Sequence, residues 1–439
     1  MKSCIFTMVA FNFAAVLGAA ETNLSYLAGS LPKEELQAIY ADDPHDAWNR
    51  IFHCLYTRTL KIRLSEDFPE AAPFATNRGE MGVSTRIFER IESGDRAMEP
   101  LYPHEQFRDD VSTAQLLVEP RFSEFQKALT DALAEKSPRP LLDRALMQYD
   151  AWAAYDFVAK DVSGWILKRA PIPLYHERQA RLRELLAQFI KKIALTPTEI
   201  KSLPDNYTLA ARFQPLPNLF ATNSEWLEVL WLSGREHDRA SHHRRAARVF
   251  VKPLTLPKDK EEFLRNARDL DFTRKLEAVV LVIQNLLVDS NGKVVPSPLT
   301  CEVQMRTFGG RGTRPPQSTR FAQYELSRRA LLKNSNTGGL KNFSKVPAYL
   351  PAAGNDYSFA APLASGDPTA VSLSSRCVAC HGSERNQIFT FAMTPRSPSP
   401  PIRSLDTAQN EHGRWVAEFK MKQDSFKKLS AAWRSATGL

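Results

Sequence analysis

Apolar side chains recur at helical spacing through most of the first half of the chain. In residues 112–200, three long stretches alternate apolar and charged positions every three to four residues, as amphipathic helices do. Prolines at positions 138, 140, 171 and 173 separate these stretches. Residues 21–110 carry a weaker pattern of the same kind, in LPKEELQAIYA and PHDAWNRIFHCLYTRTL. We therefore expect a mainly helical domain over residues 21–205, ending in the short helix and turn of LTPTEIKSLPDNY.

The pattern changes near residue 208, where β-branched and aromatic residues become frequent. Asn291 and Gly292 stand between two apolar runs, which is a strong short-range signal for a β-hairpin. In the second run, Cys301, Val303, Met305 and Thr307 alternate with Glu302, Gln304 and Arg306. Such alternation predicts an antiparallel sheet with one face in the core and the other in solvent. We expect this β-rich domain to cover residues 206–335.

Beyond residue 335 the periodicity is lost until the end of the chain. Residues 395–401 hold four prolines and predict an extended or loop-like segment. Residues 414–435 regain helical spacing and predict one final helix. Its expected core contacts are Trp415, Phe419, Phe426, Leu429 and Trp433. The expected fold class is α+β, with residues 336–439 as a C-terminal segment that follows the β-rich domain.

Residues 1–20 are interpreted as a cleaved secretion signal. An early lysine precedes an apolar run over residues 5–18, and Gly18, Ala19 and Ala20 offer a cleavage site. A buried N-terminal helix is the alternative. The run is too short to span a bilayer comfortably, and no other apolar stretch is long enough, so no transmembrane segment is expected in the mature chain. The protein is expected to be periplasmic or secreted.

The charge balance favours an acidic partner over a nucleic acid. The chain has 58 Lys and Arg residues against 49 Asp and Glu, a formal net charge of +9. The basic residues are scattered and match no nucleic-acid motif. We interpret the excess as weak electrostatic steering toward an acidic redox partner protein or surface.

The stretch SSRCVACHGSERN, residues 374–386, carries the most informative spacing in the chain. Cys377, Cys380 and His381 match Cys-x-x-Cys-His, the attachment signature of c-type haem. Two thiols at this spacing reach both vinyl groups of one porphyrin, and the adjacent imidazole reaches its iron. We therefore expect one covalent haem c, held by Cys377 and Cys380, with His381 as the proximal iron ligand.

Three other interpretations of the two cysteines are weaker. A thioredoxin-like redox pair needs a surrounding βαβ pattern, which the sequence does not show. A zinc site needs a second Cys/His pair at finger spacing, and none follows. A plain disulfide across a two-residue gap would be strained.

In this motif the chain resembles c-type cytochromes. Small cytochromes carry the motif near the start of their domain and supply a distal methionine several tens of residues later, whereas only 58 residues follow His381 here. The longer arrangement is loosely similar to that of secreted bacterial proteins with one haem motif near the C-terminus. Their counterparts would be WNRIFHCLYTR, ALMQYDAWAAYD and LLVDSNGKVVPSPLTCEVQMR. The resemblance implies single-haem electron transfer.

The distal side of the iron is left open by the sequence. Met393 is the nearest sulfur after the motif, and a thioether there would raise the reduction potential and block substrate. An open iron position or a histidine ligand is the alternative, and His412 lies before the final helix. The cluster of His237, His242 and His243 could bind a metal, but it also has the character of a solvated, arginine-rich loop.

Several other residues have two interpretations each. Arg376, Arg385 and Arg396 could pair with haem propionates or be ordinary surface arginines. Cys54 and Cys301 could form a disulfide in an oxidising compartment, although two buried free thiols are favoured because the sequence gives no distance between them. His53 is expected to be packed. The glycine-rich stretch at residues 309–312 lacks the Gly-Lys-Ser/Thr of a phosphate loop and predicts a long hairpin loop.

The favoured function is electron transfer through one haem in an exported protein. An enzyme with an open iron position, such as a peroxidase or oxidase, is the first alternative. The second is a structural or binding protein in which the haem has a minor role.

Overall fold

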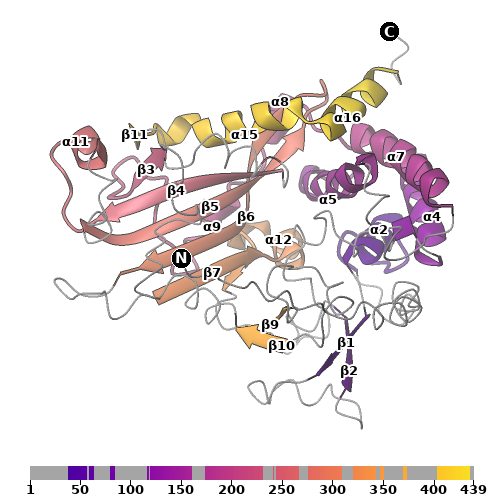
Figure 1. Ribbon diagram of the computed structural model, residues 1–439, viewed down its shortest axis with the longest axis horizontal. Coiled ribbons are helices and arrows are strands. Elements are labelled where there is room, and N and C mark those ends of the chain that lie inside the picture. Colours follow the sequence, from indigo (N-terminus) through magenta and orange to yellow (C-terminus); the bar gives the residue numbers. More distant parts are fainter. Residues whose placement is uncertain are drawn as a thin grey trace, which may run out of the picture.

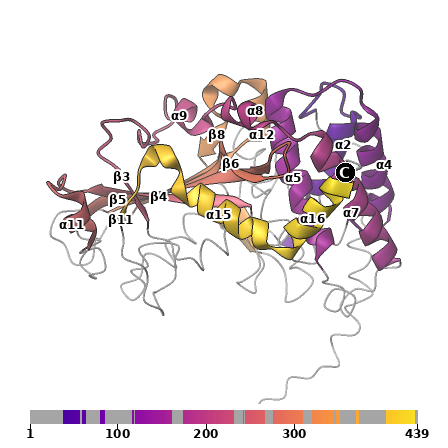
Figure 2. The ribbon, with the colours of Figure 1, turned by 90° about the horizontal axis from the view of Figure 1, so that it is seen from above.

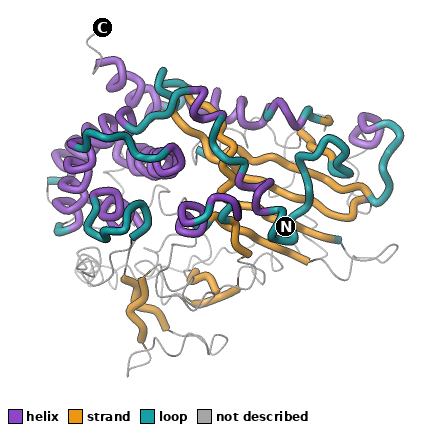
Figure 3. The backbone as a smooth tube through the Cα atoms, turned by 180° about the vertical axis from the view of Figure 1, so that it is seen from behind, coloured by secondary structure: helices purple, strands orange, loops and turns teal. Residues whose placement is uncertain are grey.

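The structure of the chain is a computed structural model. It describes residues 38–56, 59–63, 80–84, 116–117, 119–160, 174–230, 241, 244–265, 275–308, 320–342, 347–350, 369–372 and 403–435. Helices and an antiparallel sheet make up this part of the chain, so the fold class is α+β, as predicted. The long helices of the first half of the chain gather beyond one end of the sheet (Figures 1 and 3).

Four helices form the helical layer beside the sheet. They are α2 (Ala47–Tyr56), α4 (Arg121–Ala134), α5 (Leu141–Ala159) and α7 (Tyr175–Lys192). The rings of Trp48 in α2 and Phe189 in α7 pack edge to face, with centroids 5.6 Å apart. Every residue from Ala145 to Ala159 is buried, which makes α5 the central helix of the layer.

Two short helices, α8 (Pro197–Lys201) and α9 (Asn206–Ala210), lead from the helical layer to the sheet. α8 begins with a capping box, in which the side chains of Thr196 and Glu199 each accept a hydrogen bond from the other's backbone N–H. α9 is fixed to the sheet by Asn206, whose Nδ2 donates to the carbonyl oxygens of Thr300 and Gly338 at 2.9 and 3.0 Å. Figure 2 shows α8 and α9 on one side of the strands.

Seven strands form the central sheet in the order β11-β3-β4-β5-β6-β7-β8, and every neighbouring pair is antiparallel. Their bounds are β3 (Leu227–Leu230), β4 (Arg245–Pro253), β5 (Leu276–Val288), β6 (Val294–Thr307), β7 (Arg320–Leu326), β8 (Leu340–Asn342) and β11 (Arg403–Ser404). Between strands lie α11 (Lys260–Arg265), α12 (Arg328–Lys333) and a 3-10 turn, η8 (Ser335–Thr337). A second 3-10 turn, η9 (Thr407–Gln409), follows β11.

Two smaller pairs of strands lie outside this sheet. β1 (Thr59–Arg63) pairs with β2 (Glu80–Ser84), and β9 (Pro347–Leu350) pairs with β10 (Thr369–Ser372). Both pairs are antiparallel, and Figure 1 shows them on the β7 side of the central sheet.

The hairpin predicted at Asn291 and Gly292 is confirmed. β5 and β6 pair as far as Val288 and Val294, and the turn lies between these residues. Gly292 has φ +75°, a left-handed conformation that favours glycine. The Asp289 carboxylate accepts hydrogen bonds from the backbone N–H groups of Asn291 and Lys293 at 2.9 and 2.8 Å, which fixes the shape of the turn.

The C-terminal stretch forms two helices, which corrects the prediction of a single one. α15 (Glu411–Lys422) and α16 (Asp424–Ser435) are separated by Gln423, whose backbone is extended at ψ 144°. The break changes the direction of the helical faces. Of the predicted core contacts, Phe426, Leu429 and Trp433 are buried, whereas Trp415 and Phe419 are half-buried.

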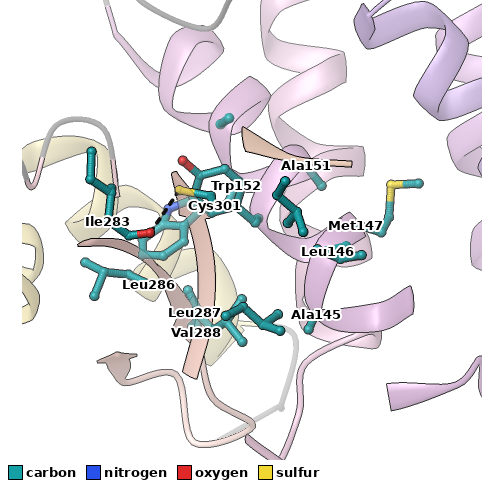
Figure 4. Packing of buried hydrophobic residues seen from close by; sticks show 14 of the residues in the cluster. Ala145, Leu146, Met147, Ala151, Trp152, Ile283, Leu286, Leu287, Val288 and Cys301 are labelled. Atoms are coloured by element: carbon teal, nitrogen blue, oxygen red, sulfur yellow. Dashed lines mark hydrogen bonds between the residues drawn. The ribbon is translucent and has the colours of Figure 1, made fainter. Parts of the chain in front are cut away.

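One apolar core joins the helical layer to the sheet. Trp152 of α5 packs against Phe426 of α16, with ring centroids 5.9 Å apart. Figure 4 shows α5 side chains facing those of β5 and β6. Because the cluster holds Leu146 as well as Leu286, it includes side chains from both sides of residue 205.

Candidate functional site

The predicted haem ligands lie outside the described residues. Cys377, Cys380, His381 and Met393 all fall between β10 and β11, in residues 373–402. The arginines at positions 376, 385 and 396 fall there too. Their roles therefore stay predictions.

The Nε2 atom of the His412 ring contacts a backbone carbonyl oxygen. His412 lies at the start of α15, is fully buried, and its Nε2 is 3.1 Å from the carbonyl oxygen of Val229 in β3. Its ring also packs edge to face on Trp415, at 5.9 Å between centroids. The imidazole therefore ties α15 to the sheet, which disfavours the expectation that His412 binds the iron.

The other histidine candidates separate into two groups. His53 is 3% exposed in α2, which agrees with the expected packed residue. His237, His242 and His243 lie outside the described residues. Among the residues that the structure describes, no group of three His, Cys, Asp or Glu side chains could hold a metal ion.

Cys54 and Cys301 are two free, buried thiols, as favoured from the sequence. Cys54 is fully buried in α2, and Cys301 is 6% exposed in β6. Burial raises the pKa of each thiol to about 12. The Cys301 sulfur lies 3.4 Å from the carbonyl oxygen of Ile283, as Figure 4 shows. Neither thiol has the reactivity of a catalytic cysteine.

The central helix α5 carries buried carboxylates that pair with basic groups from the second half of the chain. Asp150 is fully buried, and its Oδ1 lies 2.6 Å from Nη2 of Arg328 in α12. Gln148, two residues earlier, is anchored to the end of β5: its amide accepts from Val288 N at 3.0 Å and donates to Val288 O at 2.9 Å. These contacts fix the position of α5 against the strand ends.

Asp156, six residues further along α5, lies between two cations. Its Oδ2 is 2.6 Å from both Arg244 Nη1 and Lys420 Nζ, and all three side chains are at most 3% exposed. Burial alone would raise the pKa of Asp156, but Lys420 and Arg244 hold it below its ordinary value. Burial lowers the pKa of Lys420 to about 8, against the pull of Asp156. This cluster joins α5, the residue that precedes β4, and α15 through charge.

A second set of polar groups lies on one face of the sheet, and we name it the polar sheet face. It consists of Arg245 (β4), Glu302 and Gln304 (β6), and Gln323 and Glu325 (β7). Register places Glu302 opposite Glu325 and Gln304 opposite Gln323, so the four side chains point to the same side. Arg245 and Gln304 both contact Glu302, and Gln323 donates to Glu325 at 2.7 Å.

The polar sheet face corrects the expectation of a solvated face. Glu302 and Glu325 are 3% and 2% exposed, and Arg245 and Gln323 are 8% exposed. Gln304 is half-buried. Alternation along β6 indicated which residues share a face of the strand. It could not show whether the polar face is exposed to solvent or covered by protein. Pairing across strands is what makes this burial tolerable, because isolated charges are costly to bury.

Another buried ion pair lies on the opposite face of the sheet. Glu228 of β3 and Arg248 of β4 form two parallel hydrogen bonds of 2.9 and 2.6 Å. The Arg248 guanidinium also lies 4.8 Å from the ring centroid of Phe220. Since both charges are buried, this pair is a close structural counterpart of Arg245 and Glu302 on the other face.

Reasoning from sequence missed these buried charges. A signal existed for α5, because Asp150 and Asp156 are the two charged residues of the stretch Ala145–Ala159, which is mostly apolar. For β4, no local pattern separates Arg245 and Arg248, which are buried, from exposed arginines. Their partners are 57 and 20 residues away, and only the sheet brings them together.

Two further findings bear on the class of protein. Within the described ranges, no helix is both long and apolar enough to cross a bilayer. The scan against family models, the search of curated proteins and the search of solved structures each found no match to this chain.

Proposed function

We propose that the protein is an exported c-type haem protein that transfers electrons through one covalently attached haem. The observation that carries the proposal is the pentapeptide Cys377-Val378-Ala379-Cys380-His381. An apolar N-terminal run with small residues at its end supports export, and covalent attachment of this haem is normally completed outside the cytoplasm. The periplasm or the exterior is therefore the proposed location.

The haem supplies a reversible one-electron couple of its iron. Cys377 and Cys380 hold it by thioethers, and His381 binds the iron on the proximal side. Met393 is proposed as the distal ligand, where a thioether would raise the reduction potential and close the iron to substrate. The net charge of +9 supports an acidic redox partner, since opposite charge speeds encounter.

The cofactor is tested by haem staining and mass analysis of the purified protein. Wild type should retain haem after denaturation, and Cys377→Ala/Cys380→Ala should lose it. Cys54→Ala and Cys301→Ala are matched controls, because both are buried free thiols whose removal should leave the haem attached. Wild-type protein without covalent haem would overturn the proposal.

A haem enzyme with an open iron position is the second candidate. It is favoured by the short spacing of 12 residues between His381 and Met393, because small cytochromes supply their distal methionine several tens of residues after the motif. The optical spectrum separates the two. Six-coordinate, low-spin iron supports electron transfer, whereas five-coordinate, high-spin iron that binds carbon monoxide or peroxide supports catalysis. If Met393 is the ligand, Met393→Ala should remove the near-infrared sulfur-to-iron band.

A further inference from the structure

The helices α15 and α16 pass from the sheet to the helical layer, and we name residues 411–435 the C-terminal strap. Figure 2 shows α15 along the strands and α16 beside α5 and α7. At the sheet, Asn410, the N-cap of α15, donates to Gln284 of β5 at 3.2 Å. At the helical layer, Nζ of Lys428 in α16 donates to the carbonyl oxygen of Ala159 in α5 at 2.7 Å. The C-terminal strap therefore holds the two parts of the fold together.

The break between α15 and α16 lies where the sheet meets the helical layer. Gln423, the residue between the two helices, donates through Nε2 to Oγ of Ser241 at 2.5 Å and accepts from Nζ of Lys420 at 2.9 Å. The Lys420 ammonium also lies 5.4 Å from the ring centroid of Trp152 in α5. Because these partners come from α5, from the segment before β4 and from the strap itself, Lys420 lies at the point where the strap contacts both parts.

Charged groups face the Lys420 ammonium from each of these elements. Asp156 of α5 lies 2.6 Å away, and the same Oδ2 atom accepts from Arg244, which precedes β4, at 2.6 Å. Lys160, at the end of α5, adds a further positive charge. Within the described part of the chain, Asp156 is the one carboxylate in contact with Lys420. The ammonium is therefore buried at 1% exposure beside a counter-charge that a second cation also uses.

We propose that Lys420 is a proton switch for the C-terminal strap, which docks more tightly when Lys420 is neutral than when it is charged. The proposal goes beyond electron transfer and is independent of the haem. Its geometric basis is the convergence of two cations on one buried oxygen, at the junction that the strap must close. A charged Lys420 loses its hydration when the strap docks, and Arg244 and Lys160 repel it there.

The direction of the pH effect follows from the two states of the strap. Burial lowers the pKa of docked Lys420 to about 8 from its ordinary 10.5, against the pull of Asp156. A detached strap would hold the ammonium in water, with its ordinary pKa. Docking therefore releases a proton between these two values. The docking equilibrium is weakest below pH 8 and strengthens as the pH rises through 8.

The neutral amine keeps the contacts of the docked strap. Its two N–H groups can donate to Oδ2 of Asp156 and to Oε1 of Gln423, the acceptors that Lys420 already uses. Asp156 retains Arg244 as its counter-charge. Loss of the proton thus removes a buried positive charge while both hydrogen bonds of the amine remain.

The switch is tested by amide hydrogen exchange of the full-length protein at about pH 7.5 and about pH 9.5. Rates are converted to protection factors, which correct for the pH dependence of exchange itself. We expect the protection of α15 and α16 to rise roughly 20-fold, as the lowered pKa requires over this range. It should stay below that of β5 at both pH values, because the strap opens without global unfolding. No rise, or a strap as protected as β5, overturns the proposal.

Substitutions of two lysines on the strap separate Lys420 from other titrating groups. Lys420→Met has no titrating nitrogen, so its strap should show no rise in protection. Lys428→Met is the matched control, because Lys428 also contacts α5 but is exposed, and this variant should keep the rise. If Lys420→Met does not fold, Lys420→Arg gives the same test, since a guanidinium stays charged throughout this range. A rise that persists without Lys420, or that is lost in Lys428→Met, overturns the assignment of the switch.

Discussion

Asp150 and Arg328 lie 178 positions apart in the chain, yet their side chains meet at 2.6 Å with 0% and 3% exposure. The contact joins α5 of the helical layer to α12, which directly follows strand β7. A pair this deeply buried has lost its hydration, and each charge helps to compensate the other.

Removing one charge of this pair should therefore be costly. We expect Asp150→Asn to lower the free energy of unfolding by about 3–5 kcal/mol, because the buried Arg328 guanidinium loses the negative charge that lies 2.6 Å from it. Chemical denaturation monitored by circular dichroism measures the change. The control is Asp424→Asn, whose side chain is 87% exposed and pairs with Lys427, and which should change stability by less than about 1 kcal/mol. Similar losses in both variants would contradict the interpretation.

Substitution of Asn206 should lower the stability of the protein more than substitution of most other polar residues. It is fully buried, and its amide makes three hydrogen bonds to backbone groups, two with Thr300 and one with Gly338. Asn206→Ala leaves these groups without their partner, and we expect a loss of roughly 3 kcal/mol. The exposed Asn218→Ala is the matched control and should be nearly neutral. A loss below about 1 kcal/mol for Asn206→Ala would show that the backbone groups find other partners.

Alanine substitutions at two glycines should distinguish the cost of backbone strain from the cost of steric overlap. Gly292 and Gly338 have φ of +75° and +72°, so alanine is strained at both. A Cβ at 292 would lie 3.4 Å from Cδ1 of Trp433, an ordinary contact, whereas one at 338 would overlap the backbone of Asn206 and Ala210. We expect Gly292→Ala to cost about 1 kcal/mol and Gly338→Ala to cost several times more in urea unfolding. Equal costs would mean that α9 moves aside.

Asp143 gives the protein a pH dependence below neutrality. Burial at the start of α5 raises the pKa of its carboxyl to about 6, against the pull of Arg139. The folded state therefore holds this proton more tightly than the unfolded state. Stability from this residue is present at about pH 4 and is lost as pH rises through 6, a change of roughly 2–3 kcal/mol.

Asp143→Asn should remove this dependence. The difference in melting temperature between variant and wild type should grow in favour of the variant from pH 4 to pH 7. Thermal unfolding at several pH values measures it, with the exposed Asp42→Asn as control. A difference that stays constant over this range would contradict the raised pKa.

The sequence predicted the positions of helices and strands better than it predicted which of their residues are buried. Helical periodicity located α4, α5 and α7, and Asn291-Gly292 located the β5–β6 hairpin, because these signals are local in the chain. The break at Gln423 was missed, since the spacing of apolar residues in α15 and α16 continues through it without a proline or glycine. Alternation in β6 was identified correctly, but the face of Glu302 was wrongly assigned to solvent.

By itself the sequence determined the α+β class and the β5–β6 hairpin, because each depends on residues close together in the chain. The haem and its ligands stay a proposal that rests on the Cys-x-x-Cys-His spacing. Only the tertiary structure decided which polar residues are buried and with what partners. Asp156 with Arg244 and Lys420, Asp150 with Arg328, and Glu302 with Arg245 are separated by 57 to 264 positions. The physical reason is that burying a charge is tolerated only where a partner compensates it, and the folded arrangement of distant segments supplies that partner.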